Sequence, residues 1–166
     1  TLPGAKGMSA EEVERIAPVY ADRILALVRT ASKIIRKRDP DAMILSPGFE
    51  NFFQIPYPLW KRVHELLLEG GLAEHVDAFC IHNYPGHLGS KESGNHATWQ
   101  DLDRSTDSTA LIRFLEKRGA KLPLFCTEFG GFKPDLSSPE GETVAAIEIL
   151  HAGTILAHQG FIGLNY

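Results

Sequence analysis

A carboxylate, an imidazole and a phenol stand at the ends of two strand-like segments of this chain. Glu128 closes the apolar run 123–128, and His82 and Tyr84 close the run 76–84. Strand residues two apart share a face, so we expect His82, Tyr84 and Glu128 to point into the same cavity. An imidazole or phenol that donates to Glu128 holds its carboxylate ionised and oriented, as a nucleophile or base requires.

The same alternation divides the remaining residues of the two strands. It turns Leu124 and Cys126 toward the cavity, and it turns Phe79, Ile81 and Phe125 toward covering helices. Small residues deep in a strand, with polar residues at its end, fit an interior that opens into a pocket.

A structural role is the alternative for Glu128. A buried carboxylate costs free energy unless it has partners, and the backbone N–H groups of the following loop are available to it. From the spacing of the residues alone, this reading and the chemical one stay open.

The long segment 85–106 contains Trp99 and two histidines, His87 and His96. Trp99 offers an aromatic face on which the C–H groups of a sugar stack, or else it covers the core beneath the loop. His82, His87 and His96 do not match a zinc-binding spacing, so we expect neither a metal nor a cofactor.

The composition excludes several classes of protein. The chain has 166 residues, with 17 basic and 21 acidic side chains and a formal net charge of −4. A nucleic-acid or anionic-membrane binder needs a basic excess, so we expect neither partner. Cys80 and Cys126 lie in apolar runs and read as buried thiols rather than a disulfide framework. The chain starts at Thr1, which suggests a processed chain or a piece of a longer one, and its localisation stays open.

Helices and strands alternate along the chain. Ser9 and Glu12 have capping-box spacing at the start of the first helix, and Pro18 predicts a kink or a break within it. His64, in the second helix, reads as a surface histidine. We predict helices over 9–38, 58–69, 108–118 and 138–158, and strands over 42–46, 76–84, 123–128 and 161–165.

Strands separated by helices imply a parallel sheet with right-handed crossovers. An open doubly wound sheet and part of an eight-stranded barrel both satisfy this order. We predict an α/β fold, a partial (β/α)8 barrel of about four βα units, with residues 1–166 forming a single domain.

Three segments carry a family resemblance. The segment 126–130 (Cys-Thr-Glu-Phe-Gly) resembles the end of the seventh strand of clan A glycoside hydrolases, (β/α)8 barrels such as the cellulase-like family five and the xylosidase- and iduronidase-like family thirty-nine. The segment 82–84 is similar to the His-x-Tyr at the end of their sixth strand. The segment 38–49 resembles their passage into the fifth strand.

The resemblance implies a retaining O-glycosidase acting on a β-linked oligo- or polysaccharide or glycoside. Glu128 would be its nucleophile, and Tyr84 would hydrogen-bond that nucleophile. In such a site we expect His82 and Trp99 to contact the sugar, and Phe129 either lines the pocket or packs in the core. The family's acid/base glutamate follows an Asn, and this chain has no Asn-Glu pair. We expect that residue before Thr1, with this chain as the C-terminal half of the barrel.

The resemblance has further consequences, and two other hypotheses compete with it. The N-terminal half of the barrel would be a required partner, and the fragment alone would be inactive. Glu50 is a disfavoured substitute for the acid/base. A noncatalytic carbohydrate-binding degenerate barrel is the main alternative. An open-sheet hydrolase is disfavoured, because no Gly-x-Ser-x-Gly elbow or Gly-x-Gly-x-x-Gly fingerprint occurs.

Overall fold

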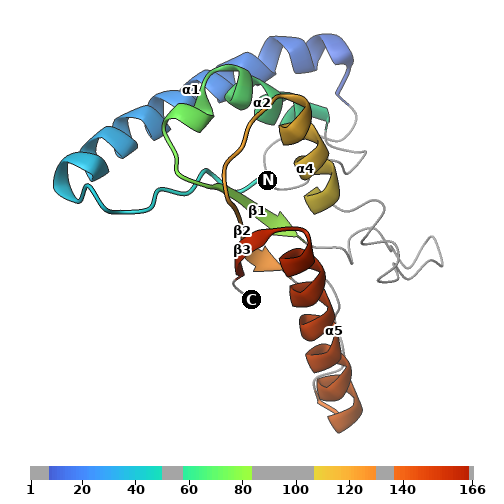
Figure 1. Ribbon diagram of the computed structural model, residues 1–166. Helices are drawn as coiled ribbons and strands as arrows, with labels where there is room; N and C mark the ends of the chain where they lie inside the picture. Colours follow the sequence, from blue (N-terminus) through green and yellow to red (C-terminus); the bar gives the residue numbers. More distant parts are fainter. Residues whose placement is uncertain (1–7, 50–57, 84–106, 130–136, 165–166) are drawn as a thin grey trace.

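The protein is a mixed α/β structure with a small parallel sheet (Figure 1). The computed structural model describes residues 8–49, 58–83, 107–129 and 137–164. Its elements, in chain order, are α1 (Ala10–Arg38), α2 (Pro58–Glu69), the 3-10 turn η1 (Leu72–Glu74), β1 (Phe79–Asn83), α4 (Asp107–Lys117), β2 (Leu124–Phe129), α5 (Pro139–His158) and β3 (Phe161–Leu164). The four predicted helices are confirmed, with ends that differ by a residue or less from the predicted ones.

The long helix α1 begins at the predicted capping box. The Ser9 side chain accepts from the backbone N–H of Glu12 at 3.2 Å, and the Glu12 carboxylate accepts from the backbone N–H of Ser9 at 2.9 Å. Helix α1 continues through Pro18, so no break occurs at this residue. Ala17 and Ala21 on the buried face let α2 pack closely along α1, and this contact stabilises the helix on both sides of the proline.

The sheet has the order β1-β2-β3, and both pairs of strands are parallel. Helix α4 lies between β1 and β2 in the chain, and α5 lies between β2 and β3. This connectivity is the βαβ arrangement that the alternating sequence predicts. The carboxyl ends of the strands therefore lie at the same edge of the sheet.

The segment 42–46, predicted as the first strand, forms only isolated parallel bridges beside β1. Leu45 bridges to Ala78, and Phe49 bridges to Ile81. The backbone N–H groups that donate to Ala78 and to Cys80 of β1 are those of Ser46 and Phe49, which are three residues apart, whereas donors in a regular parallel ladder are two apart. The ladder is therefore interrupted between them.

The prediction of a partial (β/α)8 barrel is wrong. The described residues form one sheet of three strands, with the segment 42–49 along the side of β1 that faces away from β2. The prediction required about four strands, whereas the segment 42–49 makes only isolated bridges and the sheet itself has three strands. The alternation of helix and strand reports parallel pairing, and it is equally consistent with an open sheet.

The core fills the space between the sheet and its helices. Phe79 and Ile81 of β1 are fully buried and meet apolar residues of α1, α2 and η1. Helix α5 extends away from the sheet (Figure 1), and its Leu150 is 69% exposed. Both cysteines are buried and free, as predicted. Of the helices in the described part of the chain, none has the length and apolar character that a membrane crossing requires.

His64 is buried rather than exposed, which corrects the sequence interpretation. It lies on the face of α2 that also buries Val63 and Leu67, and its ring packs against the Phe49 ring with centroids 4.6 Å apart. Burial lowers the pKa of His64 to about 4. The imidazole is therefore neutral in the folded protein at neutral pH.

We expect this burial to make stability depend on pH. The unfolded chain protonates His64 below about pH 6.5, whereas the folded protein resists protonation down to about pH 4. The contribution of neutral His64 to the free energy of unfolding is therefore fully present above pH 6.5. It falls by on the order of 3 kcal/mol as the pH decreases from about 6.5 to about 4. Urea unfolding of the wild type and of His64→Gln across this range measures the effect.

The exposed His158 supplies the matched control for this experiment. His158→Gln should retain the pH dependence of the wild type, while His64→Gln should flatten it. The same pH dependence in His64→Gln and the wild type would contradict the assignment to His64.

Candidate functional site

His82 and Glu128 lie side by side at the carboxyl ends of β1 and β2. The two residues are partners in the parallel register, and His82 Nε2 is 3.7 Å from Glu128 Oε1. The side chain of His82 is 24% exposed and that of Glu128 is 54% exposed. The pair thus stands at the open edge of the sheet, where parallel α/β folds gather their binding residues.

An irregularity in the sheet brings these two residues opposite each other. Ile81 pairs with Cys126, but the next partner of β1, His82, pairs with Glu128, so Thr127 is an extra residue in β2. One extra residue reverses which face the following side chains occupy. Glu128 therefore lies on the same face as His82, although Cys126 two residues earlier does not.

The face predicted for Leu124 and Cys126 is accordingly wrong. Cys126 is 1% exposed and belongs to the core cluster with Phe79 and Ile81, and Leu124 packs against that cluster. Phe125, predicted to face the helices, instead lies over Gly163 of β3. The residue pattern is regular through this segment, so nothing in the sequence signals the extra residue.

Cys80 and Thr127 lie beneath the pair. Cys80 Sγ is 2.7 Å from Thr127 Oγ1, within hydrogen-bond distance. Burial raises the pKa of the Cys80 thiol, the hydrogen bond with Thr127 opposes this rise, and the Glu128 carboxylate adds to it. The thiol therefore stays protonated at neutral pH. It contributes an uncharged packing surface below the pair and does not act as a second nucleophile.

The segment 46–49 forms the wall beside His82. The Ser46 hydroxyl accepts from the backbone N–H of Cys80 at 2.9 Å and donates to the carbonyl of Pro47 at 2.9 Å. The backbone N–H of Phe49 donates to the carbonyl of Cys80, and the N–H of His82 donates to the carbonyl of Phe49. Ser46 thus supplies an acceptor where the interrupted ladder would leave a buried donor unpaired.

The sequence places Ser46 and Gly48 at the end of the predicted strand 42–46, but it does not predict their contacts with β1 and His82. Gly48 lies directly against the imidazole of His82. The Ser-Pro-Gly sequence marks a turn after an apolar run, which is a local signal. It carries no information about which neighbouring strand the turn contacts.

Several predicted site residues fall outside this geometry. Tyr84, Trp99 and Glu50 lie outside the described residues. The backbone of Phe129 ends β2 and pairs with Asn83. Within the ranges the structure describes, no three His, Cys, Asp or Glu side chains converge as a metal ion would require.

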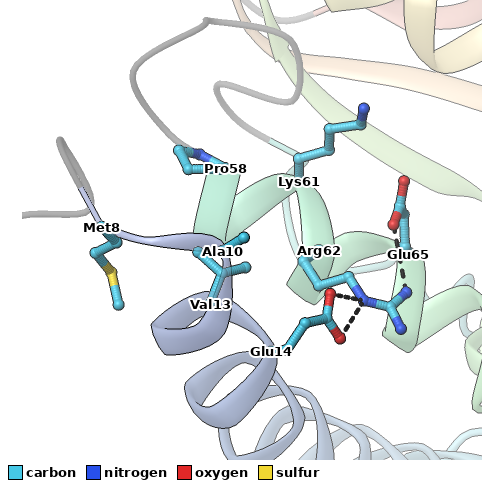
Figure 2. Close-up of a pocket in the computed structure, with 8 residues that line it drawn as sticks. All are labelled: Met8, Ala10, Val13, Glu14, Pro58, Lys61, Arg62 and Glu65. Carbon is cyan, nitrogen blue, oxygen red and sulfur yellow. Dashed lines mark hydrogen bonds and ion pairs between the residues drawn. The ribbon is translucent and has the colours of Figure 1, made fainter.

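A separate pocket of about 420 Å³ lies between the start of α1 and α2, and it contains neither His82 nor Glu128 (Figure 2). Arg62 lines it and pairs with Glu14 at 3.1 Å and with Glu65 at 3.3 Å. A third carboxylate, that of Glu69, lies 3.5 Å from the same guanidinium. These carboxylates compensate the charge of Arg62, and Lys61 also lines the pocket.

Comparisons of the chain with models of protein families, with curated proteins and with solved structures find no match.

We expect Ser46→Ala to destabilise the protein by about 1–3 kcal/mol, because it leaves the buried N–H of Cys80 without its acceptor. Chemical denaturation measures this loss. Thr30→Ala is the control, since the Thr30 hydroxyl makes a side-chain-to-backbone hydrogen bond at an exposed position of α1. Its effect should stay within about 0.5 kcal/mol. Equal losses in the two variants would show that the Ser46 hydroxyl does not support this wall.

Proposed function

We propose that this chain carries the nucleophilic half of a retaining glycosidase site, with Glu128 as the nucleophile. The observation that carries the proposal is the 3.7 Å separation of His82 Nε2 and Glu128 Oε1 at the carboxyl edge of the parallel sheet. The resemblance of the segments 82–84 and 126–130 to clan A glycoside hydrolases assigns the chemistry. The proposal concerns this pair and its reaction and does not require a closed barrel.

The exposure of the two side chains suits a nucleophile that meets a sugar. Glu128 is 54% exposed, so an anomeric carbon can approach one of its carboxylate oxygens. His82 is less exposed and borders the same carboxylate, so it restricts where that group can point. A nucleophile that is oriented before substrate binds loses less entropy in reaching the transition state.

The reaction proceeds in two displacements. A Glu128 oxygen forms a bond to the anomeric carbon as the glycosidic C–O bond breaks, and that electron pair leaves with the departing oxygen. Water then attacks the anomeric carbon of the glycosyl ester, its proton passes to a base, and the Glu128 carboxylate is released. The departing oxygen of a natural glycoside also needs a proton from a second carboxyl group, whereas a dinitrophenolate leaves without one.

Carbohydrate binding without turnover is the second candidate function. The exposure of Glu128 favours it, because a solvent-facing carboxylate accepts hydrogen bonds from sugar hydroxyl groups without any covalent step. The two functions differ in a single observable, a covalent bond between Glu128 and a sugar.

Covalent trapping tests the nucleophile. Dinitrophenyl 2-deoxy-2-fluoro-β-glycosides of the gluco, galacto and xylo series combine a leaving group that needs no acid with a fluorine that slows hydrolysis of the ester. We expect one of these reagents to add a single fluoroglycosyl group to the chain, located on Glu128 by peptide mass spectrometry. Glu128→Gln should abolish this labelling, because a carboxamide is a far weaker nucleophile.

Glu116→Gln changes an exposed glutamate of α4 and should leave the labelling intact. Label on other carboxylates at a rate that Glu128→Gln does not alter would overturn the assignment. Retention of the corresponding sugar in a binding assay, with no covalent product, would instead establish the binding function.

A further inference from the structure

The absence of a side chain at residue 48 creates the space that the imidazole of His82 occupies. A Cβ built on Gly48 would lie 2.7 Å from Nε2, 3.0 Å from Cε1 and 3.1 Å from Cδ2 of His82. Real Cβ atoms essentially never approach other atoms closer than 3.0 Å, so the ring would have to move. The three nearest atoms all belong to His82, and the contact is therefore specific to this ring.

The backbone of Gly48 does not itself require glycine. The glycines with positive φ in the described residues are Gly71, Gly119 and Gly160, so Gly48 has a backbone conformation that other residues also adopt. Its special property is the lack of a Cβ and not its torsional freedom. The three atoms nearest to an alanine Cβ here all belong to the imidazole.

The ring of His82 is consequently bounded by Gly48 and Glu128. Nε2 is the ring atom nearest to the position of the Gly48 Cβ, and the same nitrogen lies 3.7 Å from Glu128 Oε1. The hydrogen bonds of Ser46 and Phe49 to β1 hold the wall that contains Gly48 against the strand. A displacement of the ring by a new Cβ therefore changes the contact between the imidazole and the carboxylate.

We propose that Gly48 is a positioning residue that sets the place of the His82 imidazole and, through it, the orientation of the Glu128 carboxylate. Its role as a catalytic aid rests on the function proposed above, while its effect on the His82–Glu128 pair does not.

Nuclear magnetic resonance of the His82 ring tests the positioning without any substrate. The Hε1 resonance of His82, assigned from its disappearance in His82→Gln, should shift when Glu128→Gln removes the neighbouring charge. In a Gly48→Ala background, we expect this Glu128-dependent shift to be lost. A shift of the same size in both backgrounds would overturn the proposal.

Gly70→Ala is the matched control, because a Cβ at Gly70 meets Leu25 and the carbonyl of Leu66, and not His82. It should lower the melting temperature and leave the Glu128-dependent shift of His82 unchanged. Loss of that shift in Gly70→Ala as well would show that general destabilisation explains the result, and would overturn the proposal.

A second comparison covers the case in which Gly48→Ala folds poorly. The double variant Gly48→Ala/His82→Ala removes the ring that the new Cβ meets, so adding Gly48→Ala to His82→Ala should not lower the melting temperature further. An additional loss as large as the one that Gly48→Ala causes in the wild type would overturn the proposal.

Covalent labelling separates this inference from the proposed function. We expect Gly48→Ala to slow labelling of Glu128 by on the order of 10- to 100-fold, the effect of misplacing a reacting group. If Gly48→Ala loses the Glu128-dependent shift of His82 and the wild type is not labelled, the positioning role is supported and the glycosidase function is rejected. If the shift is unchanged and labelling is normal, the positioning role is rejected and the function is supported.

Discussion

The register between β1 and β2 is the constraint on which the site depends. A regular parallel pairing would continue from Ile81 and Cys126 to His82 and Thr127. The one-residue shift instead places Glu128 opposite His82. Side chains alternate between the two faces of a strand, so the extra residue moves a carboxylate from the core side of the sheet to its open side. The same shift lets Cys126 remain buried in the core while Glu128, two residues later, is accessible to water.

The packing of the helices makes that register stable. Phe79 and Ile81 are fully buried beneath α1 and α2, so β1 cannot slide along β2 without exposing them. The segment 46–49 restrains the other side of β1 with alternating hydrogen bonds to its backbone. His82 therefore occupies a position defined by β2 and by this segment. Surface side chains without such support on both sides of their strand are not held in a fixed relative position.

The helices, by contrast, follow from local sequence. The capping box of Ser9 and Glu12 and the spacing of apolar residues through α1 predict its ends, because capping and amphipathicity act within a few residues. One local signal is misleading: the pattern predicts His64 as a surface residue, although it lies among Val63, Leu67 and Phe49. Pro18 predicts a kink or a break, and α1 continues through it without a break. The sequence also predicts which functional groups lie at the ends of the strands, since Glu128 and His82 each end an apolar run.

The sequence alone determined the order of helices and strands, the parallel direction of the sheet and the side chains available at its carboxyl edge. These properties depend on the periodicity of apolar residues and on short connections. Tertiary structure decided that the sheet is open, that Thr127 is the extra residue opposite β1, and that Gly48 lies against His82. The physical reason is that closure, register and contact between distant segments depend on how whole surfaces pack. Each segment has its own pattern, and that pattern is compatible with more than one such arrangement.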